Sequence, residues 1–280
     1  MWIESLNTVM DDNKILTLAS NERIALTSDM RLLFEISNLR TATPATVSRA
    51  GILYINPGDL GWNPYVTSWV ETREDQKEKA TLTLLFDKYI PICIEIVNKR
   101  FRTITPIPSI CYIQILCKLL EALILPKNIG KEPTEAVYEL WFVFALVWSF
   151  GSALFHDGST DYKAEFSKWF TQEFKDLQIP PFTSVFDVYV DPTTQQYALW
   201  SESVPKFELE PDLPLQACLV HNSETIRVKF FMNILMDCQF PVMLIGLAGS
   251  GKTLMMNDKL SQFSEDFVIA NIPFNFYYNA

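Results

Sequence analysis

One stretch of the 280-residue chain combines glycines, a lysine and a threonine in a spacing that suits phosphate binding. Residues 246–253 match Gly-x-x-x-x-Gly-Lys-Ser/Thr at every required position. Glycines allow the backbone to wrap a phosphate with its N–H groups pointing inward, and the N-terminus of the following helix adds partial positive charge. The pattern predicts a nucleotide-binding loop in which Lys252 bridges the β- and γ-phosphates and the Thr253 hydroxyl ligates Mg²⁺. A plain glycine turn between a strand and a helix is the alternative. The loop consists of Gly246, Leu247, Ala248, Gly249, Ser250, Gly251, Lys252 and Thr253.

Hydrolysis of a nucleotide needs a further group beyond this loop. A P-loop ATPase also carries an acidic residue at the end of a later strand, which holds the metal and polarises the attacking water. The acids that follow the motif are Asp258, Glu265 and Asp266, and they fall on the expected following helix or turn. We therefore expect this unit to bind nucleotide while lacking its catalytic half.

Two residues near the start of the chain could take part in such chemistry. Glu4 follows two apolar residues, where a strand-end acid would lie, but Ile3 stands where the usual metal-binding aspartate would be. Glu4 is then either a weak candidate for polarising water or an ordinary carboxylate. Arg49 precedes an apolar run and could stabilise charge on a neighbour's γ-phosphate, as an arginine finger does. Its position alone favours a surface ion pair.

Strand-like and helix-like patterns occur along the chain in an order typical of an α/β protein. Short apolar runs predict strands, with hairpins at two places, and apolar residues three and four apart predict helices. The expected strands are residues 1–6, 15–18, 24–26, 32–36, 51–55, 185–190, 196–200, 241–245 and 267–271. The expected helices are residues 65–72, 75–101, 107–125, 134–155, 161–174, 223–238 and 252–263, with a kink at Pro91. The predicted fold class is α/β: a partial sheet, a helical subdomain, and the start of a second unit with the P-loop.

Composition excludes several classes of protein. Hydrophobic residues make up 49% of the chain and charged residues 20%, so a disordered or fibrous chain is excluded. The net charge of −10 argues against a surface that binds nucleic acid or anionic lipid. The 5 cysteines form no CxxC pair, which suits an intracellular protein with reduced thiols. The uncharged stretch 140–155 is shorter than the roughly 20 residues of a membrane span, so we expect a buried helix.

Several long stretches carry a resemblance to a known family. Residues 2–14 read WIESLNTVMDDNK, residues 42–51 read ATPATVSRAG, and residues 60–62 and 164–169 read LGW and AEFSKW. With the P-loop, they resemble the dynein heavy chains over essentially the whole sequence. The sequences of residues 17–24 and 215–221 are similar to those of the axonemal outer-arm β-type heavy chains.

The resemblance implies an AAA+ P-loop NTPase fold in four parts. Residues 1–61 would be the C-terminal part of the second module's large subdomain and residues 62–176 its helical lid. Residues 177–216 would be a proline-rich connector with a β-hairpin, and residues 217–280 the N-terminal part of the third module. The family's first module, linker, stalk, later modules and tail have no counterpart here, so the resemblance implies a fragment that is not a motor by itself.

Site roles and partners are also implied by the resemblance. Arg49 matches the arginine finger that the second module donates to ATP in the first, and Glu4 lies in a module whose nucleotide is largely structural. The P-loop would be the regulatory nucleotide site of the third module, with ATP or ADP and Mg²⁺ as cofactors. Expected partners are the neighbouring AAA+ modules and, through the full-length protein, intermediate and light chains and microtubules. No nucleic acid or membrane partner is expected. The expected location is the cytoplasm, cytoskeleton and axoneme of cilia and flagella.

Two other functions remain open at this level. An unrelated P-loop NTPase, or a kinase-like protein, would carry a strand-end aspartate downstream of Lys252. A non-enzymatic scaffold or assembly module would keep the fold and bind partners through its lid.

Overall fold

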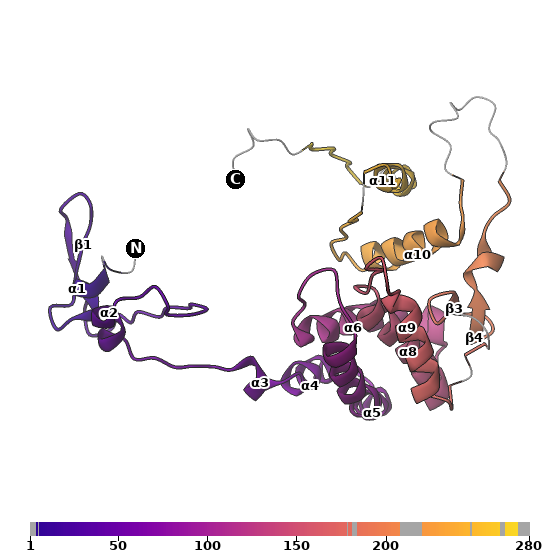
Figure 1. Ribbon diagram of the computed structural model, residues 1–280, viewed down its shortest axis with the longest axis horizontal. Coiled ribbons are helices and arrows are strands. Elements are labelled where there is room, and N and C mark those ends of the chain that lie inside the picture. Colours follow the sequence, from indigo (N-terminus) through magenta and orange to yellow (C-terminus); the bar gives the residue numbers. More distant parts are fainter. Residues whose placement is uncertain are drawn as a thin grey trace. The chain divides into compact units, whose positions relative to one another are not determined.

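The computed structural model describes residues 4, 6–177, 179–180, 184–207, 220–246, 248–263 and 267–273. The chain divides into two compact units, residues 1–60 and 61–280. Figure 1 shows the order of the elements along the chain. No helix in the described ranges has the length and apolar character that a membrane crossing requires.

The first unit contains short elements around one hairpin. Its helices are α1 (Asn7–Met10), α2 (Pro44–Arg49) and α3 (Pro57–Leu60). Strands β1 (Ile15–Thr17) and β2 (Arg23–Ala25) pair antiparallel with Leu16 opposite Ile24, which confirms the predicted hairpin. Helix α2 begins after Thr43, whose side chain accepts from the Thr46 N–H, and the Thr46 hydroxyl donates to Asn7 Oδ1 at 3.0 Å. That bond ties α2 to α1.

The second unit is built around a bundle of helices. These are α4 (Asn63–Glu71), α5 (Gln76–Arg100), α6 (Ser109–Leu123), α7 (Pro126–Ile129), α8 (Glu135–Gly151) and α9 (Tyr162–Glu173). Five of them confirm predicted helices to within a few residues. Helix α5 continues through Pro91. Proline has no N–H to donate to the carbonyl of Asp87, one turn earlier. Both residues lie on the exposed side of the helix, so water can bind that carbonyl instead.

Helix α8 forms the centre of the core. Most of its side chains are buried, as expected for a helix that is apolar on every side. Phe142 packs edge-on against Phe86 of α5 at 5.1 Å between ring centroids, and Phe150 stacks on Tyr112 of α6 at 4.9 Å. Each fully buried side chain of this size contributes about 1.5–3 kcal/mol. The uncharged stretch is thus a core helix, as predicted.

A second hairpin and two further helices complete this unit. Strands β3 (Val188–Asp191) and β4 (Gln196–Leu199) pair antiparallel, again as predicted, and lead into the 3₁₀ turn η2 (Trp200–Ser203). Helix α10 (Ser223–Asp237) places Phe231 against Phe144 and Trp148 of α8 at 5.9 and 4.6 Å between centroids. Helix α11 (Lys252–Leu260) packs on α10, on the side away from the bundle (Figure 1).

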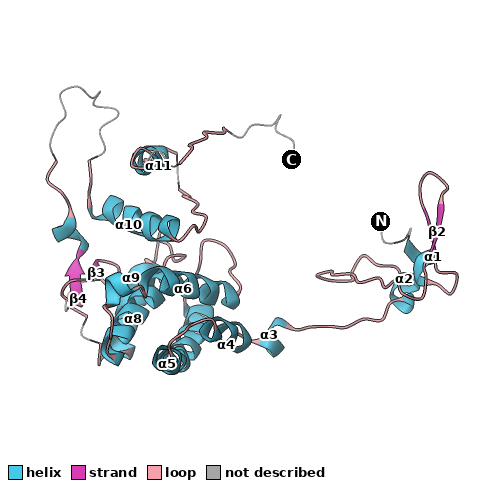
Figure 2. Cartoon of the chain, turned by 180° about the vertical axis from the view of Figure 1, so that it is seen from behind, coloured by secondary structure: helices cyan, strands magenta, loops and turns pink. Residues whose placement is uncertain are grey.

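Several predicted strands were wrong. Residues 32–36, 51–55, 241–245 and 267–271 form no strand, and Figure 2 shows them as loop. Of the predicted strand 1–6, residues 4 and 6 lie in a 3₁₀ turn, and residues 1–3 and 5 lie outside the described residues. A strand needs a neighbour for its N–H and C=O groups, and within the described ranges pairing occurs only in the two hairpins and at isolated bridges.

Candidate functional site

The loop that precedes α11 has the backbone that its glycines predict. Gly249 and Gly251 have φ angles of 77° and 81°, a region that residues with a side chain rarely adopt. A Cβ at either position would meet no atom within 4 Å, so the backbone conformation, and not crowding, calls for glycine there. Gly251 is also the residue that caps α11. Leu247 lies outside the described residues.

The side chain of Lys252 folds back over this loop. Its Nζ donates to the carbonyl oxygen of Gly246 at 2.9 Å and to Ser250 Oγ at 3.2 Å. An ammonium group held by neutral acceptors gains a stronger, charge-assisted bond when a phosphate oxygen takes their place. The lysine is therefore placed inside the loop by contacts that an anion can replace.

The start of α11 adds further groups for an anion. Met255 N–H donates to the Gly251 carbonyl at 3.0 Å, and the N–H groups of a helix's first turn have no acceptor within the helix. No side chain caps this end. Thr253 lies in the first turn and is exposed, so its hydroxyl is accessible to a metal ion. Glycines, ammonium, helix start and hydroxyl together match the donor set that a magnesium-bound nucleotide phosphate requires.

An ion pair that the sequence patterns did not reveal holds α11 in place. Lys229 of α10 contacts Asp258 Oδ2 of α11 at 2.7 Å, and Gln262 Nε2 donates to the same oxygen at 3.2 Å. Both charged side chains are about three-quarters buried. Asp258 is thus bound to side chains of α10 and of the turn after α11. Two residues this far apart in sequence leave no local signal.

Arg49 and Glu4 belong to the first unit. Arg49 Nε donates to Asp11 Oδ1 at 2.7 Å and its NH1 donates to the Ala45 carbonyl at 2.9 Å. The hydrogen bond from the guanidinium and the charge of Asp11 raise the pKa of Arg49 above its ordinary value. Glu4 is exposed and lies in the 3₁₀ turn before α1, and residues 1–3, where the strand before it was expected, lie outside the described residues. Neither residue lies in the compact unit that carries the P-loop.

Two family models match the chain. The model described as "Dynein heavy chain AAA lid domain" matches residues 82–202, and "P-loop containing dynein motor region" matches residues 207–280. Together they cover most of the sequence and confirm the predicted AAA+ α/β fold class.

Several proteins named as dynein chains are similar to this chain in sequence. The chain is 59% identical to "Dynein beta chain, ciliary" of Heliocidaris crassispina, over 277 residues. It is 56% identical to "Dynein axonemal heavy chain 17" of Homo sapiens over 278 residues, and 37% identical to "Dynein alpha chain, flagellar outer arm" of Chlamydomonas reinhardtii over 287. Each match covers 99% of this chain and 6% of the relative, so the chain spans a small part of the proteins that it resembles.

Proposed function

The chain belongs to the dynein heavy-chain family, and we propose that residues 246–253 bind ATP or ADP with Mg²⁺ as one nucleotide site of a dynein motor ring. The observation that carries this proposal is the loop itself. Two glycines adopt left-handed backbone at the start of α11, and the Lys252 ammonium lies over the same loop, 2.9 Å from the Gly246 carbonyl. The match of residues 207–280 to the dynein P-loop model supports the same assignment.

Each residue of the loop has a separate task in this proposal. Lys252 leaves the Gly246 carbonyl and binds phosphate oxygens, which neutralises charge between the β- and γ-phosphates. The Thr253 hydroxyl is the protein ligand for Mg²⁺, which would screen the phosphate charge. The Lys229–Asp258 pair keeps α11 against α10, so the helix N-terminus stays directed at the phosphates.

We assign the parts of the chain by the same family membership. Residues 1–61 are proposed as the end of the second module's large subdomain, 62–176 as its lid, 177–216 as a connector and 217–280 as the start of the third module.

Arg49 is then proposed as the arginine finger for nucleotide in the preceding module. Its pair with Asp11 is about one-third exposed, and ion pairs that water can reach are weak, so Arg49 can exchange Asp11 for a phosphate. Glu4 remains a weak candidate for the second module's own site.

The wider role follows from the relatives. We propose that the full-length protein couples ATP hydrolysis to microtubule-based movement in the axoneme of cilia or flagella. Neighbouring AAA+ modules, intermediate and light chains, and microtubules would be its partners. Within this chain the proposed contribution is nucleotide binding.

The experiment that tests nucleotide binding measures the melting temperature of the 280-residue chain with and without millimolar Mg-ATP. Saturating ligand at about one hundred times its Kd stabilises a protein by roughly 2.7 kcal/mol, which is a clear shift in the melt. Lys252→Ala should abolish that shift. The matched control is Lys168→Ala, an exposed lysine of α9, which should retain it. No shift in the parent chain, or an equal shift in Lys252→Ala, would contradict the proposal.

A further inference from the structure

The ion pair between Arg49 and Asp11 joins the last turn of α2 to the residue that caps the C-terminus of α1. Arg49 Nε donates to Asp11 Oδ1 at 2.7 Å, and its NH1 donates to the Ala45 carbonyl, one turn earlier in α2, at 2.9 Å. Carboxylates and phosphates both bind a guanidinium through anionic oxygens that accept from its N–H groups. An incoming phosphate therefore competes with Asp11 for the Arg49 side chain.

Helices α1 and α2 are also held together without this pair. The hydroxyl of Thr46 donates to Asn7 Oδ1 at 3.0 Å, and Thr46 is only 5% exposed. Val9 of α1 is buried as well, at 3% exposed. These contacts fix the backbones that carry Asp11 and Arg49, so opening the ion pair moves two side chains and leaves the two helices in place.

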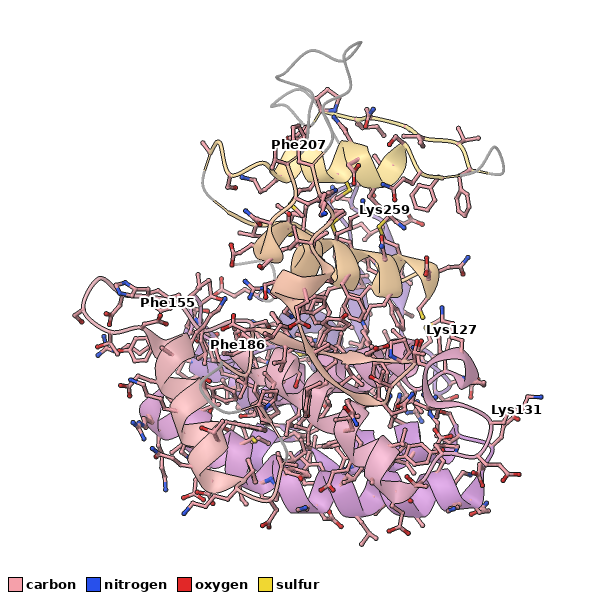
Figure 3. All side chains as sticks on the ribbon, turned by 90° about the vertical axis from the view of Figure 1, so that its right-hand side faces the viewer. Lys127, Lys131, Phe155, Phe186, Phe207 and Lys259 are labelled. Carbon is pink, nitrogen blue, oxygen red and sulfur yellow. The ribbon has the colours of Figure 1, made fainter. Side chains whose placement is uncertain are left out.

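The Arg49 guanidinium lacks a packing contact that the other paired arginines have. In the described ranges each of the others lies over an aromatic ring: Arg73 over Trp69, Arg100 over Phe101 and Arg227 over Trp148. Arg227 also donates to the carbonyl of Phe186, labelled in Figure 3, at 3.2 Å. Arg49 lies over no ring among the described residues, and water reaches about one-third of its side chain. Arg49 can therefore change partners without breaking a stacking contact.

We propose that Asp11 is a positioning residue that holds Arg49 in a resting position until a γ-phosphate takes its place. This inference rests on the proposed role of Arg49 as the arginine finger for the preceding module. A terminal phosphate carries more negative charge than one carboxylate, so it attracts the guanidinium more strongly. Without that phosphate the guanidinium returns to Asp11. The contact thus makes engagement of the finger depend on the nucleotide that is bound.

Single-turnover hydrolysis of ATP by the full-length protein tests this role, because it separates cleavage from product release. Asp11→Asn removes the competing charge and keeps the size of the side chain. It should raise the cleavage rate roughly two- to fivefold, since a larger fraction of Arg49 is then free to bind phosphate. A residue that only supported the fold would give a slower rate instead. Asp11→Glu retains a carboxylate and should stay close to the parent rate.

Asp12→Asn is the matched control for this substitution. It makes the same change of charge at the neighbouring position, which is exposed and forms no ion pair among the described residues, so the rate should stay unchanged. The melting temperature of the 280-residue chain should be the same in the parent and in Asp11→Asn. A marked loss in Asp11→Asn would show that the pair is structural and would overturn the inference.

Arg49→Ala separates failure of this inference from failure of the proposed function. An arginine finger is worth about a thousandfold or more in rate, so Arg49→Ala should slow cleavage strongly. If it does, and Asp11→Asn is no faster than the parent, the role of Asp11 is overturned while the finger role stands. If Arg49→Ala leaves the rate unchanged, the finger role fails and the inference fails with it.

Discussion

Replacing Gly151 with alanine should destabilise the second unit because of one aromatic ring. Gly151 is the last residue of α8 and is buried. An added Cβ would overlap the Phe186 ring, with Cε1 at 2.5 Å, and would meet Phe166 Cδ1 at 3.6 Å. Phe186 cannot move aside freely, since it is 5% exposed and packs against Trp148 and Phe166 at 5.4 and 6.0 Å between centroids. The substitution therefore overfills a packed core.

The expected magnitude combines two opposing effects. Overpacking of this kind costs about 1–3 kcal/mol. Alanine has a higher helix propensity than glycine, which stabilises the helix by up to about 1 kcal/mol. We expect a net loss of about 1–2 kcal/mol in the free energy of unfolding, which lowers the melting temperature of a unit this size by roughly 2–8 °C. Phe186→Leu alone should also destabilise the second unit, because it removes a buried ring. In the Gly151→Ala background the same substitution also removes the overlap, so its cost in unfolding free energy should be smaller there than in the parent chain.

Urea denaturation followed by circular dichroism measures this double-mutant cycle. The four chains are the parent, the two single variants and the double variant, and the coupling energy should favour the double variant by about 1 kcal/mol or more. Gly51→Ala serves as the control, because a Cβ there meets no atom within 4 Å. Undiminished stability of Gly151→Ala, or strictly additive single effects, would refute the packing argument.

Two further predictions concern the ion pair and a buried thiol. Lys229→Gln should speed amide hydrogen exchange in α11 several-fold, measured by mass spectrometry, because it removes the partner of Asp258 that ties α11 to α10. Burial, followed by the charge of Glu121, raises the pKa of Cys117 to about 12. Between about pH 9 and 12 the folded chain keeps a proton that the unfolded chain loses, so this thiol lowers stability by about 1.4 kcal/mol per pH unit as pH rises.

Each of these two predictions has an internal comparison. Lys99→Gln breaks a pair with Glu95 that is more than half exposed, and it should leave exchange in α11 as it is. Equal exchange in the parent chain and Lys229→Gln would contradict the role given to that pair. For the thiol, Cys117→Ala should flatten the alkaline fall in unfolding free energy relative to the parent. Parallel curves for the two chains between pH 9 and 11 would be incompatible with the raised pKa.

Helices, hairpins and the glycine-rich loop before α11 could be predicted from the sequence because neighbouring residues specify them. Apolar spacing placed α5, α6 and α8 to within a few residues, and the turns at β1–β2 and β3–β4 were recognisable from short polar runs between apolar ones. The same holds for the left-handed backbone at Gly249 and Gly251, which only glycine adopts without strain. Family membership also rests on sequence alone, in stretches of ten or more residues.

The tertiary structure decided which apolar runs form strands and which distant side chains are in contact. The apolar runs at 51–55 and 241–245 read as strands, yet a strand exists only where another segment supplies hydrogen-bond partners, and none of the described residues does so there. The Lys229–Asp258 pair, the contact of Gly151 with Phe186, and the Arg49–Asp11 pair likewise join residues far apart in the chain. Local patterns report the conformation of a few consecutive residues, whereas these features arise from how whole helices pack, which no local pattern encodes.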